Sequence, residues 1–392
     1  MKSKRARREE PAAAGHAPRG DEGGGAARVD AQLVGLGLGV KFVVLLFGAQ
    51  AFTAARNQRL ASLYEWLVIW NQWDAPHYLD LARDGYVSGG VQARWIVFYP
   101  FYPWLVRACA FVLGDHLLSA FFVSAVASVA AGLLLYRLAR LDERDQTARA
   151  SVLFLLAFPT SYFLHIGYTE SLFLALTLGA FLAARERRWW LVGLLGALAG
   201  MTRVNGLLLV PALAFEALDE YRGGGRRWRW EWLWVLSAGV GFAVYLLINF
   251  QVFGDPFAFL RAQDQFWYKQ LAWPWVSVVK TWGAVTGLAP AEALIVGWHE
   301  LFFILVGLGC TAWSWATQRR SYAVWMTLSW LLWTSTSFAL SVPRYTLVMF
   351  PLYLLVARAA ARWPLAGVLV LVWSLLFMAL FIGRFVTGHW AF

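Results

Sequence analysis

The sequence predicts an all-α protein that crosses a membrane many times. Of its 392 residues 60% are hydrophobic and only 15% are charged, and the mean hydropathy is +0.54, which excludes a soluble domain of this length. Apolar runs recur along the chain, and a helix satisfies its own backbone hydrogen bonds inside a bilayer. The 24 tryptophans and 14 tyrosines fit aromatic belts at two membrane interfaces.

The apolar runs predict about eleven membrane-spanning helices. They lie at residues 33–53, 117–137, 150–166, 169–185, 190–203, 205–218, 232–250, 300–317, 322–341, 345–361 and 365–383. Several runs are short, and we expect these to be half-helices packed against neighbours rather than exposed to lipid. Residues 99–114 are apolar but too short to span, which favours a re-entrant or interfacial helix.

The placement of arginine predicts the orientation. With the N-terminus inside, every second loop is rich in arginine, as the positive-inside rule requires. The clusters lie at residues 137–149, 185–188, 222–229, 319–320 and 358–362. The net charge of +11 is therefore an orientation signal, and no nucleic acid partner is expected. The long loops 54–116 and 251–299 then lie outside and carry amphipathic stretches typical of interfacial helices.

The N-terminal residues and the cysteines bear on the domain organisation. Residues 1–30 are rich in Arg, Ala, Gly and Pro without an apolar period, which predicts a disordered cytoplasmic tail before one membrane domain at 31–392. Lys41 falls inside the first span and is expected to reach back to the cytoplasmic face. Cys109 and Cys310 have no metal-ligand or disulfide spacing. Nucleotide-binding and metal-binding motifs are absent, so we expect neither a cofactor nor a metal.

A polar, aromatic segment in the first outer loop holds the leading candidate residue, Asp74. A carboxylate at the outer surface can act as the general base that takes the proton from an acceptor hydroxyl as it attacks a sugar C1. The alternative is a helix N-cap, because Asp before Ala-Pro is also a typical helix start. His77, three residues on, would face the same cavity, where it orients Asp74, binds phosphate or makes a structural hydrogen bond. Asp80 is interpreted as a solvated charge.

Tight connections between spans supply further ionisable groups. Glu170 follows Tyr168 and either contacts the acceptor, pairs with an arginine or places charge in the first turn of a helix. Arg203, beside Asn205, and Arg344 are the natural phosphate clamps, since a guanidinium holds a phosphodiester through two donors. The alternative for both arginines is a structural ion pair with Glu170.

The second outer loop mixes basic, acidic and aromatic side chains. Arg261, Asp264, Lys269 and Lys280 lie there among Trp267, Tyr268, Trp273 and Trp275. That mixture suits stacking on a sugar, but we favour an ordinary interfacial helix.

Five segments together resemble the PIG-V family of membrane mannosyltransferases, whose eukaryotic member adds the second mannose of the glycosylphosphatidylinositol anchor. The segments are Trp73–Tyr78 with Gly85-Tyr86, Phe98–Pro103, Phe158–Phe173, Thr202–Gly206 and Pro343–Tyr345. Where the family usually starts its second segment with Phe-Phe-Pro, this chain has Phe98-Tyr99-Pro100. The resemblance covers most of the chain after residue 60.

The resemblance implies a GT-C fold with its site on the outer face. It implies a polyprenyl-phosphate sugar as donor, a glycolipid or glycan hydroxyl as acceptor, inversion at C1 and Asp74 as the base. Donor phosphate is then expected at Arg203, Arg344 and His77. The residues expected to support the site or contact the acceptor are Trp73, Tyr78, Tyr168, Glu170 and Asn205. The membrane would be a bacterial plasma membrane, or the endoplasmic reticulum with a lumenal site in a eukaryote.

Two other functions share part of this pattern. A transporter or flippase of lipid-linked sugars would have polar residues near the bilayer midplane and internal repeats, and the sequence has neither. A non-catalytic subunit of a sugar-transfer complex would keep the fold but not the reaction, and the intact Trp73-Asp74 pair argues against it.

Overall fold

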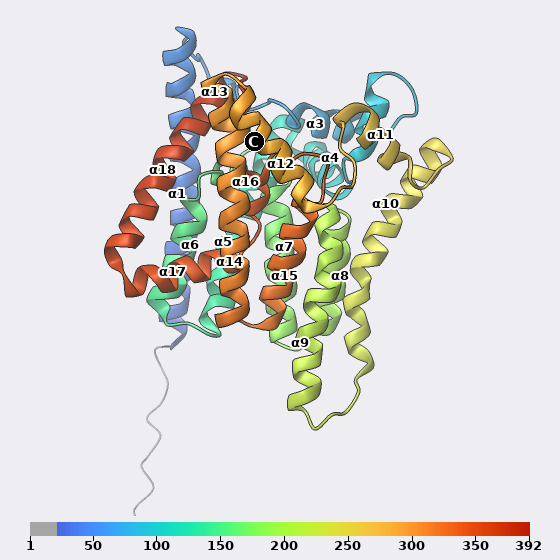
Figure 1. Cartoon of the computed structure of the whole chain (residues 1–392), viewed down its shortest axis with the longest axis vertical. Coiled ribbons are helices and arrows are strands. Elements are labelled where there is room, and N and C mark those ends of the chain that lie inside the picture. The colour runs from blue at the N-terminus through green and yellow to red at the C-terminus, as the bar shows by residue number, and fades with distance from the viewer. Residues whose placement is uncertain (1–21) are drawn as a thin grey trace, which may run out of the picture.

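The protein is a bundle of helices, described by a computed structural model for residues 22–392. Figure 1 shows the helices running between two ends of the molecule, with shorter helices crossing one end. Within the described residues the only β pairing is an isolated bridge between Leu271 and Thr336. The predicted all-α class is confirmed.

The first half of the chain folds into helices of very different lengths. They are α1 (Glu22–Arg56), α2 (Leu63–Val68), α3 (Ala75–Asp84), the 3-10 helix η1 (Val91–Val97), α4 (Phe101–Leu113), α5 (His116–Arg140), α6 (Asp145–Leu156), the 3-10 helix η2 (Ser161–Leu164), α7 (Glu170–Arg185), α8 (Trp189–Gly200), the 3-10 helix η3 (Val204–Leu208) and α9 (Leu209–Gly223).

The second half adds the remaining spans and one helical layer at the end of the molecule. Its helices are the 3-10 helix η4 (Trp230–Leu236), α10 (Ser237–Phe253), α11 (Ala258–Trp267), α12 (Pro274–Gly287), α13 (Pro290–Glu292), the π-helix η5 (Ala293–His299), α14 (Glu300–Thr317), α15 (Arg320–Thr334), α16 (Val342–Thr346), α17 (Pro351–Arg362) and α18 (Pro364–Val386).

Among residues 22–392, five helical segments are long and apolar enough to cross a membrane, which makes this an integral membrane protein. They are Ala27–Arg56, His116–Arg140, Trp230–Phe253, Pro290–Thr317 and Pro364–Val386. The other predicted spans coincide with helices of 12 to 16 residues. Such helices are roughly 18–24 Å long, shorter than the bilayer core of about 30 Å. The count of eleven full spans is therefore not confirmed.

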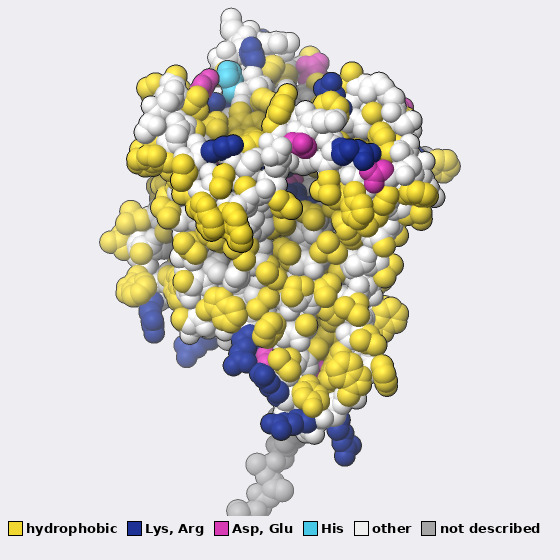
Figure 2. Space-filling model, turned by 45° about the vertical axis from the view of Figure 1, so that its right-hand side comes forward, with side chains coloured by type: hydrophobic (Ala, Val, Ile, Leu, Met, Phe, Trp, Pro, Cys, Tyr) yellow, Lys and Arg dark blue, Asp and Glu magenta, His cyan; other side chains and the backbone are white. Residues whose placement is uncertain are grey.

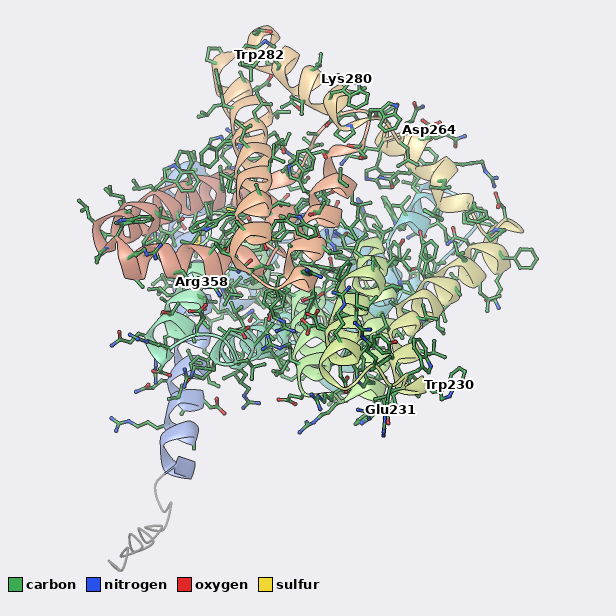
Figure 3. The ribbon with its side chains drawn as sticks, turned by 60° about the horizontal axis from the view of Figure 1, so that its bottom comes forward. Trp230, Glu231, Asp264, Lys280, Trp282 and Arg358 are labelled. Carbon is green, nitrogen blue, oxygen red and sulfur yellow. The ribbon has the colours of Figure 1, made fainter. Side chains whose placement is uncertain are left out.

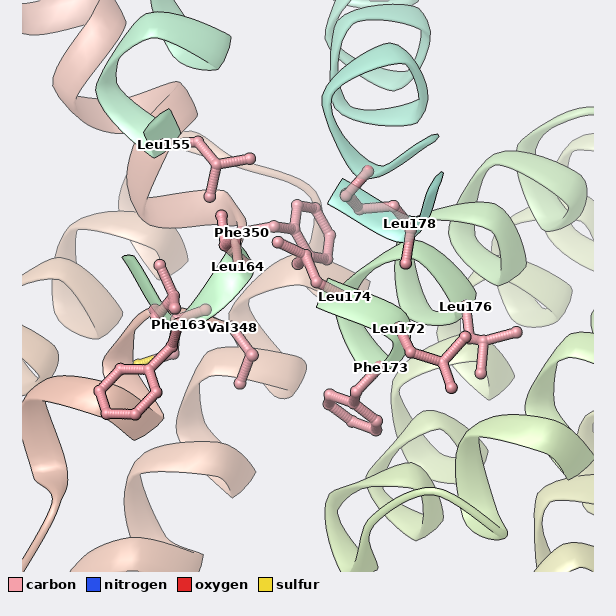
Figure 4. Packing of buried hydrophobic residues seen from close by; sticks show 14 of the residues in the cluster. Leu155, Phe163, Leu164, Leu172, Phe173, Leu174, Leu176, Leu178, Val348 and Phe350 are labelled. Carbon is pink, nitrogen blue, oxygen red and sulfur yellow. The ribbon is translucent and has the colours of Figure 1, made fainter. Parts of the chain in front are cut away.

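Helix α7 explains how a short helix is accommodated. All but two of its 16 residues are buried, which is typical of a helix that is apolar on every side. Figure 4 shows leucines and Phe173 of α7 in one cluster with Phe163 and Leu164 of η2 and with Phe350. Protein rather than lipid surrounds α7, so its ends need not reach the bilayer surfaces.

The predicted re-entrant helix at 99–114 corresponds to α4. Helix α4 meets η1 at 115°, so the pair forms a broken span or a re-entrant loop. Of the predicted tail 1–30, residues 1–21 lie outside the described residues. Residues 22–30 instead begin α1, where Asp30 pairs with Arg137 at 2.7 Å.

The expectation that Lys41 reaches the cytoplasmic face is wrong. Its Nζ donates to the carbonyl oxygens of His165, at 2.6 Å, and Phe121, at 3.3 Å. His165 follows the 3-10 helix η2, whose last carbonyl groups have no partner in a continuing helix. Lys41 is therefore held inside the bundle by backbone acceptors that the sequence pattern did not reveal.

The two ends of the molecule differ in charge. Figure 2 shows Lys and Arg side chains gathered at the lower end, near the N-terminal trace. Arginines there pair with acidic residues, as in Arg185 with Asp142 at 2.7 Å and Arg319 with Glu216 at 2.7 Å. Figure 3 places Trp230 and Glu231 toward this end and Asp264, Lys280 and Trp282 at the other. The arrangement agrees with the arginine alternation, which assigns the lower end to the cytoplasm.

The orientation predicts the outcome of cysteine labelling from the outer face. In a protein whose two native cysteines are replaced, a cysteine at Ser88 should react and a cysteine at Gly224 should not, because the two exposed positions lie in loops at opposite ends. A membrane-impermeant maleimide on intact cells provides the measurement. The reverse pattern would contradict the orientation.

Candidate active site

A cavity of about 530 Å³ opens between α3, η3, α11, α16 and the segment before α16. Helices α3, α11 and α16, which carry lining residues, lie toward the upper end of the molecule in Figure 1, whereas the loop between α9 and α10, which carries one of the arginine clusters, lies at the lower end. Aromatic side chains form much of its wall, and they include Trp73, Tyr78, Phe98, Trp267, Trp333 and Tyr345. Charged side chains converge on the same space, so the cavity has both apolar and polar walls.

Asp74 reaches the cavity from a turn that precedes α3. The hydroxyl of Tyr168 accepts from the Asp74 amide at 3.2 Å and donates to the Gln72 carbonyl at 2.9 Å. Between them Trp73 has φ +57°, in the left-handed region, and packs edge-on against Trp390 with ring centroids 5.0 Å apart. These contacts hold a turn that a non-glycine residue rarely adopts.

The structure does not support the N-cap alternative for the Asp74 side chain. Asp74 occupies the N-cap position of α3, but its backbone is helical and its carboxylate makes no capping hydrogen bond. Its Oδ2 instead accepts from Arg344 Nη1 at 3.0 Å. The other oxygen, Oδ1, accepts no hydrogen bond from a described residue, and the side chain is 23% exposed. One face of the carboxylate is therefore held and the other faces the cavity.

Four charged groups form a continuous chain along the cavity wall, with Glu170 behind the other three. Arg344 contacts Asp74 and, through Nε at 3.1 Å, Glu170 Oε1. The same Glu170 oxygen accepts from Arg203 Nη1 at 2.5 Å, and that nitrogen also donates to Thr169 Oγ1 at 2.8 Å. Glu170 is fully buried and Arg344 nearly so, and in such surroundings a nearby opposite charge offsets part of the cost of burial. The ion pair that the sequence offered for both arginines is present.

The pairing leaves part of each guanidinium group available to a ligand. Arg203 and Arg344 both line the cavity, and neither Nη2 donates a hydrogen bond to a described residue. Burial opposes the charge of Arg344, but Glu170 and Asp74 outweigh it and raise the pKa of the guanidinium above its usual value. Arg344 is thus a permanent cation at the cavity wall.

The surroundings of Tyr345 and His77 differ in charge. Burial alone would raise the pKa of the Tyr345 phenol, but Lys269, Arg344 and Arg203 together lower it below its usual value. For His77 burial lowers the pKa and outweighs the opposite effect of Asp74. The His77 imidazole stacks on Trp95, with ring centroids 3.5 Å apart. The cationic part of the cavity lies around Tyr345.

All nine residues that the sequence singled out for the site lie together. Seven line the cavity, namely Trp73, Asp74, His77, Tyr78, Arg203, Asn205 and Arg344. Tyr168 and Glu170 stand behind them and hold Asp74 and the two arginines. Asp80 instead pairs with Arg83 at 2.7 Å in a partly exposed contact, as expected of a solvated charge.

The sequence interpretation missed the contribution of the second outer loop. Lys269 was assigned to an interfacial helix, but it lines the cavity together with Trp267. Its Nζ lies 3.3 Å from the Leu340 carbonyl oxygen and 5.5 Å from the Tyr345 ring centroid. Residues 270–272 pair with 335–337 across the isolated bridge, and this pairing turns Lys269 inward. Only the adjacency of Trp267 and Lys269 hinted at this role.

Several buried polar atoms of cavity-lining residues form no hydrogen bond with another described residue. Besides Arg344 Nε, which contacts Glu170 only as an ion pair, they are Trp333 Nε1, Trp390 Nε1, Asn205 Nδ2, Tyr99 Oη and His77 Nδ1. A buried donor or acceptor left unpaired is costly, so such a set points to a ligand with several hydrogen-bonding groups. Among the described residues no group of three or more His, Cys, Asp or Glu side chains is placed to hold a metal ion.

Known proteins share parts of this sequence. Residues 99–250 match a family described as dolichyl-phosphate-mannose-protein mannosyltransferase. GPI alpha-1,6-mannosyltransferase 2 of Rattus norvegicus is 30% identical over 208 residues, 47% of this chain and 41% of the rat protein. GPI mannosyltransferase 2 of Schizosaccharomyces pombe is 29% identical over 170 residues, 41% of this chain and 35% of the yeast protein. The resemblance to the PIG-V mannosyltransferases is confirmed. The chain spans less than half the length of these curated relatives.

Two solved structures are more distantly similar. An oligosaccharyltransferase of Archaeoglobus fulgidus, in complex with Zn and sulfate, is 12% identical with a TM-score of 0.45, over 89% of this chain and 53% of that one. ArnT from Cupriavidus metallidurans, bound to undecaprenyl phosphate, is 15% identical with a TM-score of 0.42, over 91% and 77%. Similarity at this level transfers no residue role to this chain.

The ion-pair chain predicts that Glu170→Gln destabilises the protein. The change keeps the shape but leaves Arg203 and Arg344 without their shared counter-ion, and breaking a buried pair costs about 3–5 kcal/mol. Thermal unfolding in detergent should show a clearly lower midpoint. Glu231→Gln is the matched control, because that carboxylate is 54% exposed and pairs only at the surface. An unchanged unfolding midpoint for Glu170→Gln would show that this chain of ion pairs does not stabilise the protein.

Proposed function

We propose that this protein is a membrane glycosyltransferase that moves a sugar from a polyprenyl-phosphate donor to a hydroxyl of a glycolipid or glycan. The observation that supports this proposal most directly is the position of the Asp74 carboxylate. Asp74 lines the cavity, and its Oδ2 accepts a hydrogen bond from Arg344 at 3.0 Å, so Oδ1 is left for a substrate. Mannose is the proposed sugar because the curated relatives are named mannosyltransferases. Because the chain resembles the PIG-V family, the proposal includes the GT-C fold.

Asp74 is the proposed general base. Its free Oδ1 takes the proton of the acceptor hydroxyl while the hydroxyl oxygen attacks C1 of the sugar. The bond between C1 and the phosphate oxygen breaks, and its electron pair leaves with polyprenyl phosphate. Attack and departure on opposite faces invert the configuration at C1, so the reaction needs no covalent intermediate. Asp74→Asn would therefore keep the geometry but lose the proton acceptor.

The cations around the cavity suit a phosphodiester donor. Arg203, Arg344 and Lys269 carry three positive charges, and Asp74 and Glu170 carry two negative charges in the same region. The surplus of one positive charge matches the single negative charge of a sugar phosphodiester. Charge that develops on the departing phosphate would be stabilised by cations already in place, without reorganisation. His77, whose Nδ1 has no hydrogen-bond partner among the described residues, would contribute a hydrogen bond.

The remaining walls suit a sugar. Aromatic faces pack against the apolar face of a pyranose, and the unpartnered atoms of Asn205, Trp333 and Trp390 can bond to its hydroxyls. Trp73 and Tyr78 would complete the acceptor side beside Asp74. The position of the cavity, at the end away from the arginine clusters, supports an outer-face reaction in a bacterial plasma membrane, or a lumenal one in the endoplasmic reticulum. It disfavours a transporter, whose site would lie at the midplane.

The proposed base is tested with Asp74→Asn in purified protein in lipid. Transfer of labelled mannose from polyprenyl-phosphate-mannose to a panel of glycolipid acceptors should fall by about 10²–10⁴-fold. Binding of the donor should persist, because other groups hold the phosphate. Asp80→Asn on the same helix is the control and should transfer at the parental rate. A folded Asp74→Asn protein with full activity would take Asp74 out of the chemistry.

The proposed phosphate contacts are tested by the Michaelis constant for the donor. Arg203→Lys and Arg344→Lys keep the charge but lose the two-donor geometry, and Lys269→Gln removes a charge. Each should raise the donor KM, since losing a charge-assisted hydrogen bond costs on the order of 1.5–3 kcal/mol. Lys280→Gln, on an exposed stretch of α12, is the control. Normal donor use in all three variants would make these residues structural only.

A further inference from the structure

One buried carboxylate has no part in the proposed chemistry. Glu300, the first residue of α14, is fully buried. Its Oε1 accepts from the Ser341 amide at 2.7 Å, and its Oε2 accepts from the Val342 amide at 2.8 Å. No Lys, Arg or His nitrogen of a described residue comes within ion-pair distance of it. Two charge-assisted backbone hydrogen bonds therefore compensate the burial of this group.

The two amides belong to the turn that begins α16. Ser341 has φ +72°, in the left-handed region that a non-glycine residue rarely adopts. Ser341 is the N-cap of α16, yet its side chain makes no capping hydrogen bond. Pro343, the second residue of the helix, has no amide hydrogen. Glu300, from another helix, thus serves in place of a local cap and holds the strained turn.

Helix α16 carries Arg344 into the site. It has only five residues, and a helix this short is not stable by its own hydrogen bonds. Apart from Glu300, its backbone is tied to the bundle by Thr160, whose Oγ1 donates to the Pro343 carbonyl at 2.9 Å. The direction in which Arg344 points therefore depends on how the start of this short helix is held.

We propose that Glu300 is a positioning residue. By binding the amides of Ser341 and Val342, it holds the start of α16 so that Arg344 points at Asp74 and Glu170. The effect on sugar transfer rests on the proposed function. The effect on the turn does not, because the hydrogen bonds exist whatever the cavity binds. The two parts can therefore be tested separately.

The turn is tested by hydrogen–deuterium exchange on the full chain in lipid nanodiscs. In Glu300→Gln one acceptor oxygen is lost and an amide NH₂ faces a backbone N–H. Exchange of the peptide covering 338–346 should quicken by about tenfold or more, the factor for one lost charge-assisted hydrogen bond. Glu216→Gln is the matched control, a buried carboxylate held by Arg319 and Ser321 at the other end. Unchanged exchange at 338–346 in Glu300→Gln would overturn the proposal.

The link to Arg344 is tested by a double-mutant cycle on turnover. Glu300→Gln should lower sugar transfer by about tenfold. Combined with Arg344→Lys it should lower transfer no further than Arg344→Lys alone, since Glu300 acts through that arginine. Losses that multiply would overturn the proposal. If the parent protein transfers no sugar, the proposed function fails and the exchange experiment still decides the role of Glu300.

A rescue separates positioning from general stability. Glycine adopts a positive φ without steric cost, so Ser341→Gly should restore part of the exchange protection and turnover lost in Glu300→Gln. If Glu300→Gln alone does not fold, exchange and turnover are measured on the double variant Glu300→Gln/Ser341→Gly. Failure of Ser341→Gly to improve either property over Glu300→Gln would show that Glu300 does not act by holding this turn, and would overturn the proposal.

Discussion

The alternating chain of Asp74, Arg344, Glu170 and Arg203 is the contact on which the rest of the site depends. Its members come from four separate segments, and removing one charge of a buried ion pair while leaving the other is strongly destabilising. The turn before α3, the start of α7, the start of η3 and the helix α16 must therefore meet at one place. Tyr168 fixes the first of these segments and Glu300 the last.

Helices that are shorter than the bilayer core create the space for this chain of ion pairs. Helix α7 begins at Glu170 inside the bundle, and α15 ends at Thr334 before the segment that leads to Arg344. Where a helix ends, its terminal backbone amide and carbonyl groups have no partner within the helix, and here side chains supply the missing hydrogen bonds. Lys41 binds the carbonyl after η2, and Glu300 binds the amides before α16. Irregular backbone is tolerated at this depth because protein, rather than lipid, surrounds it.

The candidate site was largely predictable, because ionisable groups at tight connections between apolar runs stand out from the rest of the chain. Glu170, Arg203 and Arg344 lie at such connections, and Asp74 lies in a polar, aromatic segment of the long first outer loop. Lys269 did not stand out, because the outer loop around it is polar and aromatic throughout. Its inward direction follows from pairing with residues 335–337, which sequence spacing does not reveal. The number of full spans stays a prediction for a related reason, since an apolar run surrounded by lipid looks like an apolar run surrounded by protein.

The sequence by itself determined the all-α class, the arginine asymmetry between the two ends and the set of ionisable residues available to a site. These follow from local composition, which fixes where apolar surface and charge fall along the chain. Only the tertiary structure decided which charges pair, which helices are enclosed and which side chains face the cavity. Asp74 and Arg344 are 270 residues apart. A contact over that separation depends on how the whole bundle packs, and no local pattern encodes it.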